Sequence, residues 1–183
     1  MSLHIVLGPM FSGKTTRLIQ EYRRRTYINE SVAVVNYADD TRYDATQLTT
    51  HDNIMIPCIQ TLRLGSIMDS LENTHSIFIN EGQFFPDLYE TVLELVENMG
   101  KNVFIFGLDG DFKRAIFGDI YRLIPLCDTV EKLSALCSQC RDGTPAIFSH
   151  RVTQEREQIS IGSDNYIPLC RRCYIEKGCQ NTL

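Results

Sequence analysis

A phosphate-binding signature near the amino terminus constrains this chain more than any other feature. Residues 8–15 read Gly-Pro-Met-Phe-Ser-Gly-Lys-Thr and match the pattern G-x-x-x-x-G-K-[ST]. An apolar segment, residues 3–7, precedes it, and residues 14–29 have helical spacing, with Leu18 and Tyr22 on one face. Glycines allow backbone N–H groups to surround a phosphate, and the following helix directs its positive end at the anion. The motif in this context predicts a nucleotide-binding α/β fold.

Within the signature, two side chains have specific chemistry. Lys14 is expected to reach the β- and γ-phosphates of ATP, and the hydroxyl of Thr15 to meet the Mg²⁺ that accompanies them. The expected phosphate-binding residues are Gly8, Pro9, Met10, Phe11, Ser12, Gly13, Lys14 and Thr15.

Apolar segments alternate with helical ones over the first two thirds of the chain. Residues 31–36, 76–79 and 103–108 read as buried strands, residues 65–73 and 86–98 as helices, and residues 39–53 as a loop. Strands that are apolar on both faces favour a mainly parallel sheet covered on both sides. The alternation ends near residue 130. We therefore expect a P-loop NTPase-like α/β domain over residues 1–134 and a small second domain over residues 135–183.

A carboxylate follows one of these strands. Residues 77–79 are apolar and lead into Asn80 and Glu81, at the carboxyl end of the strand, where open α/β sheets bind ligands. Glu81 there is able to orient an attacking hydroxyl and accept its proton. The alternative, an ordinary solvated loop glutamate, is the weaker reading.

Four of the seven cysteines form two C-x-x-C pairs, Cys137/Cys140 and Cys170/Cys173, with 29 residues between the pairs. Four thiolates complete a closed tetrahedral zinc site, which is structural because a catalytic zinc keeps one position open. Zinc also explains how a short segment with little apolar content folds. A redox dithiol needs only one pair. Cys58, Cys127 and Cys179 have no such spacing and read as small core or surface residues.

Composition narrows the class of protein. Hydrophobic residues make up 43% of the 183 residues and the net charge is −5, which argues against non-specific nucleic-acid binding. No apolar run approaches the length of about 20 residues that a membrane helix needs. The first expected strand begins too early to leave room for a signal peptide. An odd number of cysteines, seven, without an export signal favours a reducing compartment.

Together the motifs resemble one family, the type II thymidine kinases of cellular, bacterial and poxvirus type. The resemblance rests on residues 8–15, then Asp40-Thr41-Arg42-Tyr43, Glu81-Gly82-Gln83-Phe84-Phe85, Leu108-Asp109-Gly110-Asp111-Phe112, and the paired cysteines, in that order. It covers nearly the whole chain.

The resemblance implies transfer of the γ-phosphate of ATP, with Mg²⁺, to the 5′-hydroxyl of thymidine. It implies that Glu81 is the general base, that Asp40 and Arg42 lie near the phosphate-transfer region with Asn80, and that a lasso-like loop of the zinc domain closes over the nucleoside. It also implies a cytoplasmic homotetramer (in the host cytoplasm if viral) that is inhibited by dTTP and binds neither nucleic acid nor membrane. The implied nucleoside-binding residues are Met10, Leu108, Phe112, Phe117, Ile159, Ser160, Ile161, Gly162 and Tyr166.

One departure from the family pattern bears on activity. The family usually has Asp before the catalytic Glu, and this chain has Asn80, so a catalytically impaired relative is one alternative. An ATP-dependent nucleic-acid-binding protein with a zinc ribbon is another. Six basic and five acidic residues from residue 137 onward disfavour that second alternative, because such binding depends on an excess of Lys and Arg.

Overall fold

The computed structural model describes residues 1–38, 47–49, 54–153, 157–159 and 165–180. Its largest element is a six-stranded sheet in the order β5-β2-β6-β7-β1-β8. Every pair of neighbouring strands in it runs parallel, so the predicted mainly parallel α/β fold is confirmed. The strands are β1 (Ser2–Leu7), β2 (Val32–Tyr37), β5 (Ile59–Thr61), β6 (Ser76–Ile79), β7 (Asn102–Gly107) and β8 (Thr129–Lys132).

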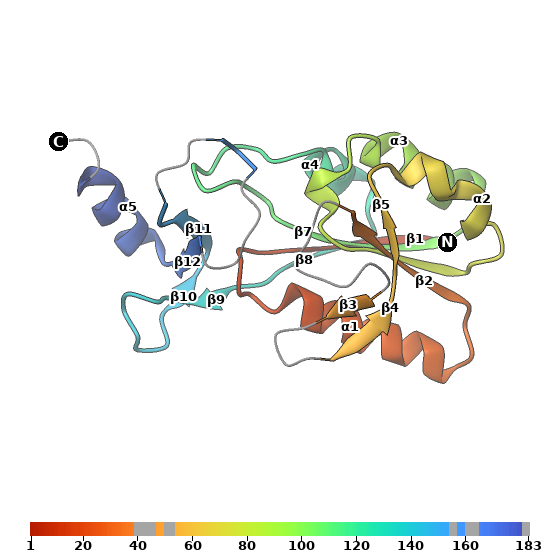
Figure 1. The fold of residues 1–183 in the computed structure, drawn as a ribbon, viewed down its shortest axis with the longest axis horizontal. Coiled ribbons are helices and arrows are strands. Elements are labelled where there is room, and N and C mark those ends of the chain that lie inside the picture. Colours follow the sequence, from red (N-terminus) through yellow and green to blue (C-terminus); the bar gives the residue numbers. More distant parts are fainter. Residues whose placement is uncertain (39–46, 50–53, 154–156, 160–164, 181–183) are drawn as a thin grey trace.

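Helices cover both faces of this sheet (Figure 1). On one face, Leu18 of α1 (Lys14–Tyr27) packs in a core with Phe78 and Phe104. On the other face, Leu88 and the neighbouring helices form a second core with the isoleucines of β6 and β7. The remaining helical elements of this part are η1 (Leu64–Ile67), α2 (Met68–Leu71), η2 (Gly82–Phe84), α3 (Leu88–Leu93), the π-helical turn Glu94–Asn98, α4 (Ile120–Leu123) and η4 (Ile124–Leu126).

Strand β6 shows why its sequence is apolar throughout. All four of its residues are buried. Ile77 and Ile79 belong to one core and Phe78 to the other, because successive side chains of a strand point to opposite faces. A strand covered on both sides therefore carries no polar alternation.

Two local expectations differ from the structure. Residues 47–49, which were expected to be loop, form β3 (Gln47–Thr49), paired with β4 (Met55–Pro57). Leu48 is fully buried in the core that includes Leu18 of α1. Its tertiary packing therefore outweighs the polar residues around it in the sequence, which had indicated a loop. The helix expected from residue 86 begins at Leu88. Asp87 instead accepts hydrogen bonds from the N–H groups of Leu64 and Gly65, at 3.1 and 2.9 Å.

The described residues from Ala135 onward form a smaller part at one end of the molecule (Figure 1). Two antiparallel pairs, β9 with β10 and β11 with β12, lie beside helix α5. Their core includes Ala135, Ala146 and Leu169 together with cysteines. The elements are β9 (Ala135–Leu136), β10 (Pro145–Ala146), β11 (Phe148–Arg151), β12 (Tyr166–Leu169) and α5 (Arg171–Gln180). The division at residue 134 stays a prediction.

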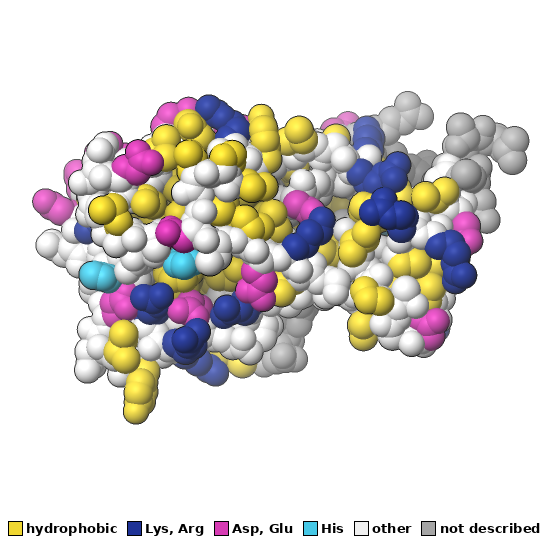
Figure 2. All heavy atoms as spheres, turned by 180° about the vertical axis from the view of Figure 1, so that it is seen from behind, with side chains coloured by type: hydrophobic (Ala, Val, Ile, Leu, Met, Phe, Trp, Pro, Cys, Tyr) yellow, Lys and Arg dark blue, Asp and Glu magenta, His cyan; other side chains and the backbone are white. Residues whose placement is uncertain are grey.

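Apolar side chains also reach the surface. Figure 2 shows such side chains gathered over the larger part of the molecule, on the face opposite to that of Figure 1. Tyr121, Ile124, Leu126 and Val130, from α4 to the edge strand β8, are each between 42% and 48% exposed. Among the described residues, no helix combines the length and apolar character that crossing a bilayer requires.

Candidate active site and cysteine cluster

The phosphate-binding signature forms the turn between β1 and α1. Phe11 and Gly13 have positive φ angles of 65° and 83°, which reverse the backbone just before the helix begins. The Nζ atom of Lys14 donates to the carbonyl oxygens of Gly8 and Pro9, at 2.9 and 2.8 Å. The lysine ammonium is thus held against the loop at the amino-terminal end of α1, an arrangement that suits an anion.

The interior of this loop also fits a phosphate. The hydroxyl of Ser12 is buried and has no hydrogen-bond partner among the described residues, which is unfavourable unless a ligand supplies one. A phosphate oxygen in the loop would accept this hydrogen bond. Gly8 is required by close packing, since a Cβ atom there would lie 2.6 Å from Ser12 Oγ and 2.9 Å from the carbonyl oxygen of Leu133.

Glu81 follows β6 in a conformation that is rare for a residue with a side chain. Its φ and ψ angles are 53° and 43°, in the left-handed region, which costs about 1–3 kcal/mol and is concentrated at functional sites. Gln83 Nε2 donates to Glu81 Oε2 at 2.7 Å, and Gln83 Oε1 accepts from the N–H of Leu108 at 3.0 Å. Gln83 therefore orients the carboxylate and ties it to the residue after β7.

Sequence reasoning assigned no role to Gln83. It is buried, and two glycines make room for it. A Cβ atom on Gly107 would lie 2.5 Å from Gln83 Oε1, and one on Gly118 would lie 2.2 Å from the Gln83 carbonyl oxygen. Two features of the sequence could have pointed to Gln83. It stands two residues after Glu81, and Gly107 and Gly118 occur at positions where the packed structure leaves no room for a side chain.

Asn80 lies between β6 and Glu81 and is almost fully buried, with 2% exposure. Its Nδ2 donates to Asn36 Oδ1 at 2.8 Å, and Asn36 Nδ2 donates in turn to Gln60 Oε1 at 3.2 Å. These three amides connect the carboxyl ends of β6, β2 and β5. The side chain of Asn80 is thus partly committed to a structural network at this edge of the sheet.

The expected nucleoside-binding residues fall into two groups. Phe117 is buried and meets Phe84 edge to face, with ring centroids 5.4 Å apart. Phe112 and Tyr166 instead both contact Arg151. Ile159, which belongs to neither group, is 52% exposed.

The loop of the signature also contacts the smaller part of the molecule. The Met10 N–H donates to Ser149 Oγ of β11 at 2.9 Å, which joins the phosphate loop to the segment that carries the predicted lasso. Sequence reasoning did not single out Ser149. Five expected site residues lie outside the described residues, namely Asp40, Arg42, Ser160, Ile161 and Gly162.

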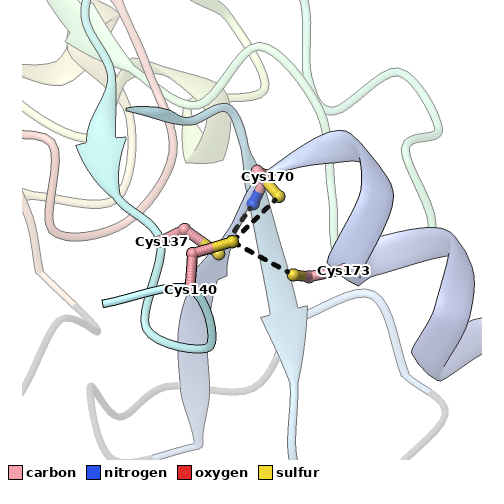
Figure 3. Close-up of side chains that lie close together, drawn as sticks. All are labelled: Cys137, Cys140, Cys170 and Cys173. Atoms are coloured by element: carbon pink, nitrogen blue, oxygen red, sulfur yellow. Dashed lines mark hydrogen bonds between the residues drawn. The ribbon is translucent and has the colours of Figure 1, made fainter. Parts of the chain in front are cut away.

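The four paired cysteines converge in the smaller part (Figure 3). Their sulfur atoms lie within 4.8 Å of one another, and Cys140 Sγ is 3.8 Å from that of Cys170 and 3.5 Å from that of Cys173. A tetrahedral zinc with bonds of about 2.3 Å holds its sulfurs about 3.8 Å apart. The cluster is therefore positioned to hold a metal ion, as the spacing predicted. Cys58 and Cys127 lie outside it.

The electrostatics of the cluster suit a cation. Although burial opposes ionisation, hydrogen bonds from the N–H groups of Cys170, Cys140 and Gln139 lower the pKa of the Cys137 thiol to about 6. Burial and the neighbouring cysteines raise the pKa of Cys173 to about 12. One thiolate thus forms readily, whereas a full set of four needs a bound cation to offset their repulsion.

Comparison with known proteins identifies a single family. The model of the thymidine kinase family matches residues 1–174. The chain is 41% identical over 173 residues to the thymidine kinase of Sheeppox virus (strain KS-1), covering 94% of this chain and 96% of that one. It is 40% identical over 175 residues to that of Vaccinia virus (strain Western Reserve), covering 95% and 97%. It is 39% identical over 176 residues to a cytosolic thymidine kinase of Gallus gallus, covering 96% and 77%.

Proposed function

The chain belongs to the thymidine kinase family, and from that premise we propose that it transfers the γ-phosphate of ATP to the 5′-hydroxyl of thymidine. The observation that carries the proposal is the family match over residues 1–174, on a sheet where the phosphate loop and Glu81 both follow parallel strands. Such carboxyl edges are where open α/β sheets bind ligands.

Phosphoryl transfer depends mainly on positioning and charge neutralisation. We assign Lys14 and the backbone of residues 8–15 to the ATP phosphates. Thr15, Asn80, Asp40 and Arg42 would lie in the vicinity of the phosphates and of Mg²⁺, an ion that neutralises phosphate charge when bound. The buried hydroxyl of Ser12, for which the described part of the chain offers no hydrogen-bond partner, supports a phosphate in this loop.

Glu81 is the proposed general base. Its carboxylate accepts a hydrogen bond from Gln83 Nε2, 2.7 Å away, and a carboxylate held in this way is suited to orient the nucleoside hydroxyl and accept its proton. The left-handed backbone at Glu81 supports a functional role, because such strain persists where the surrounding structure imposes it.

The nucleoside site is proposed to lie between the two parts of the molecule. Met10, Leu108, Phe112 and Phe117 would provide its apolar and aromatic walls, and Ile159, Ser160, Ile161 and Gly162 the backbone groups that read the thymine edge, supported by Tyr166. The bond between the Met10 N–H and Ser149 supports this placement, because it brings the phosphate loop and β11 together.

Zinc is the proposed occupant of the cysteine cluster, with a structural role. Four sulfur ligands leave no open position for a substrate, and Cys137, Cys140, Cys170 and Cys173 all contribute to or pack against the small core. The metal would hold β9, β12 and α5 together.

We further propose a cytoplasmic homotetramer that dTTP inhibits, on the strength of family membership. The exposed apolar side chains of α4, η4 and β8 support association between copies, since large exposed apolar patches mark interaction sites. Sedimentation of the purified chain tests the tetramer, and inhibition by added dTTP tests the feedback.

Phosphorylation of a nucleoside panel tests the activity. We expect ATP-dependent phosphorylation of thymidine well above that of deoxycytidine and purine nucleosides. Glu81→Gln should fold normally and lose about 10²–10⁴-fold in kcat, the usual contribution of a general base. Exposed Glu97→Gln serves as the matched control and should behave as wild type. Wild-type turnover by Glu81→Gln would exclude Glu81 as the base.

A further inference from the structure

Arg151 is a buried arginine that the proposed mechanism does not use. It ends β11 and is only 5% exposed. An arginine is rarely buried unless its donors are satisfied. The groups that surround it therefore indicate its role.

The guanidinium group of Arg151 joins residues from separate segments of the nucleoside site. Its Cζ atom lies 3.8 Å from the centroid of the Phe112 ring, in a cation–π contact. Its Nε atom donates to the hydroxyl oxygen of Tyr166 at 3.2 Å, and Nη2 donates to the same oxygen. One planar group thus contacts Phe112 and Tyr166, two of the three aromatic residues that were expected to bind or support the nucleoside.

The same group also holds the backbone that precedes residues 160–164. Nη1 of Arg151 donates to the carbonyl oxygen of Glu157, and Nη2 donates to that of Gln158 at 3.1 Å. Both carbonyl groups come just before the segment proposed to read the thymine edge. The conformation in which the chain enters that segment is therefore constrained by Arg151.

A second contact joins the same two regions. Gln158 Nε2 donates to Asp111 Oδ2 at 3.0 Å and to the carbonyl oxygen of Ile116 at 3.2 Å. The other oxygen of Asp111 accepts from the N–H groups of Lys113 and Ala115, both at 2.8 Å. Asp111 therefore shapes the loop that carries Phe112 and fastens Gln158 to that loop.

We propose that Arg151 is a positioning residue for nucleoside binding, an inference that rests on the proposed function. Its guanidinium aligns the Phe112 ring with the backbone of residues 157–158, and Gln158 and Asp111 reinforce this alignment. Thymidine then meets an arranged site and does not have to order these groups itself. A lysine cannot replace Arg151, because an ammonium group lacks the planar fork of donors that bonds Tyr166 and two carbonyl groups together.

Steady-state kinetics of Arg151→Lys and Arg151→Met test this inference. We expect the KM for thymidine to rise about tenfold or more in both variants, with kcat within about threefold of wild type, because a lost positioning contact weakens ground-state and transition-state binding alike. The KM for ATP should not change. A wild-type KM for thymidine in Arg151→Lys would overturn the inference, since a positive charge on a long side chain would then suffice at this position.

Arg122→Met is the matched control. The Cζ atom of Arg122 lies 3.8 Å from the Tyr89 ring centroid, the same separation as in the Arg151–Phe112 pair. Arg122 is exposed, and its partners, Tyr89, Glu90 and Asp119, are not among the residues assigned to the site, so its loss should leave both KM values unchanged. An equal rise in the KM for thymidine in this control would attribute the effect to general loss of packing.

Further measurements distinguish a loss of folding from a loss of nucleoside binding. Zinc content and melting temperature of each variant report folding, and Gln158→Leu offers a second variant that leaves Arg151 in place. We expect Gln158→Leu to raise the KM for thymidine in the same direction, and an unchanged value would contradict the inference. Wild-type protein that fails to phosphorylate thymidine would refute the proposed function itself, whereas active wild type with unaltered Arg151 variants would refute only the role of Arg151.

Discussion

Asn80 places a neutral amide where the thymidine kinase family usually has a carboxylate. The structure gives this amide a partner, because Asn80 donates to Asn36 and Asn36 donates to Gln60. An aspartate at position 80 would lack the donor that Asn36 Oδ1 now accepts from. The choice of asparagine is therefore coupled to its neighbours on β2 and β5.

For Asn80→Asp we expect tighter apparent Mg²⁺ binding in the kinase reaction, because a carboxylate adds charge beside the phosphates. We also expect a loss of about 1–3 kcal/mol in the free energy of unfolding, since the buried Asn36 carbonyl oxygen loses its hydrogen bond. Rates measured against Mg²⁺ concentration, and urea unfolding, check the two effects. Exposed Asn73→Asp is the control, and an unchanged apparent Mg²⁺ affinity in Asn80→Asp would contradict the metal-site assignment.

Helix α1 is anchored at its carboxyl end by a network of charges. Glu21 is 7% exposed and accepts hydrogen bonds from Arg24 at 2.7 Å and Arg25 at 3.1 Å. Arg25 also bonds Glu30 at 3.3 Å, and Glu30 accepts from the hydroxyl of Ser76 in β6. The helix is thus fastened to the sheet by ionic as well as apolar contacts.

This network predicts how stability depends on pH. Burial opposes ionisation of Glu30, but hydrogen bonds from Ser76 and Arg25 prevail and lower its pKa from 4.5. A carboxyl with a lowered folded-state pKa stabilises the protein above its unfolded pKa, and that stabilisation is lost as the pH falls through the folded-state pKa. Glu30→Gln should therefore destabilise the chain by about 1–2 kcal/mol at pH 7.

Urea unfolding between pH 7 and pH 3 measures this effect. The gap between wild type and Glu30→Gln should shrink as the pH falls below 4.5, the value for an unperturbed glutamate. Glu72→Gln, at an exposed position, should track wild type throughout. A gap that stays constant across this range would mean that ionisation of Glu30 contributes nothing to stability.

In the part of the chain that the structure describes, a large sheet carries two hydrophobic cores and the smaller part has a third. The small core contains few apolar side chains besides its cysteines, so it cannot supply much burial free energy by itself. A small unit of this kind needs another source of stability such as a metal. Contacts such as Met10 with Ser149 then connect the two parts around the proposed nucleoside site.

Metal analysis and chelation test the source of that stability. We expect about one zinc per chain, as four sulfur ligands complete one site. Chelation should expose residues 135–180 to proteolysis before residues 1–132. Cys140→Ser should lose zinc, whereas Cys127→Ser, outside the cluster, should retain it. Folded and active protein without any metal would overturn the zinc assignment.

Much of this protein can be deduced from its sequence because the relevant physics is local. The signature of residues 8–15, the apolar run of β6 and the spacing of the two cysteine pairs each specify a structure through neighbours close in sequence. The parallel sheet, the phosphate loop and the convergence of four cysteines could therefore be predicted without coordinates. Family resemblance added the substrate and the expected nucleoside-binding residues.

Other features depend on residues that only the folded chain brings together. Gln83 orients Glu81 because Gly107 and Gly118 leave it room, and Asn80 is held by Asn36, 44 positions away. Arg151 meets Phe112 across the boundary between the two parts. Packing contacts and buried hydrogen bonds join residues that are close in space but far apart in sequence, so no fixed spacing along the chain reveals them. The sequence by itself thus determined the fold class and the chemistry of its motifs. The tertiary structure decided which other side chains hold the functional residues of those motifs in place.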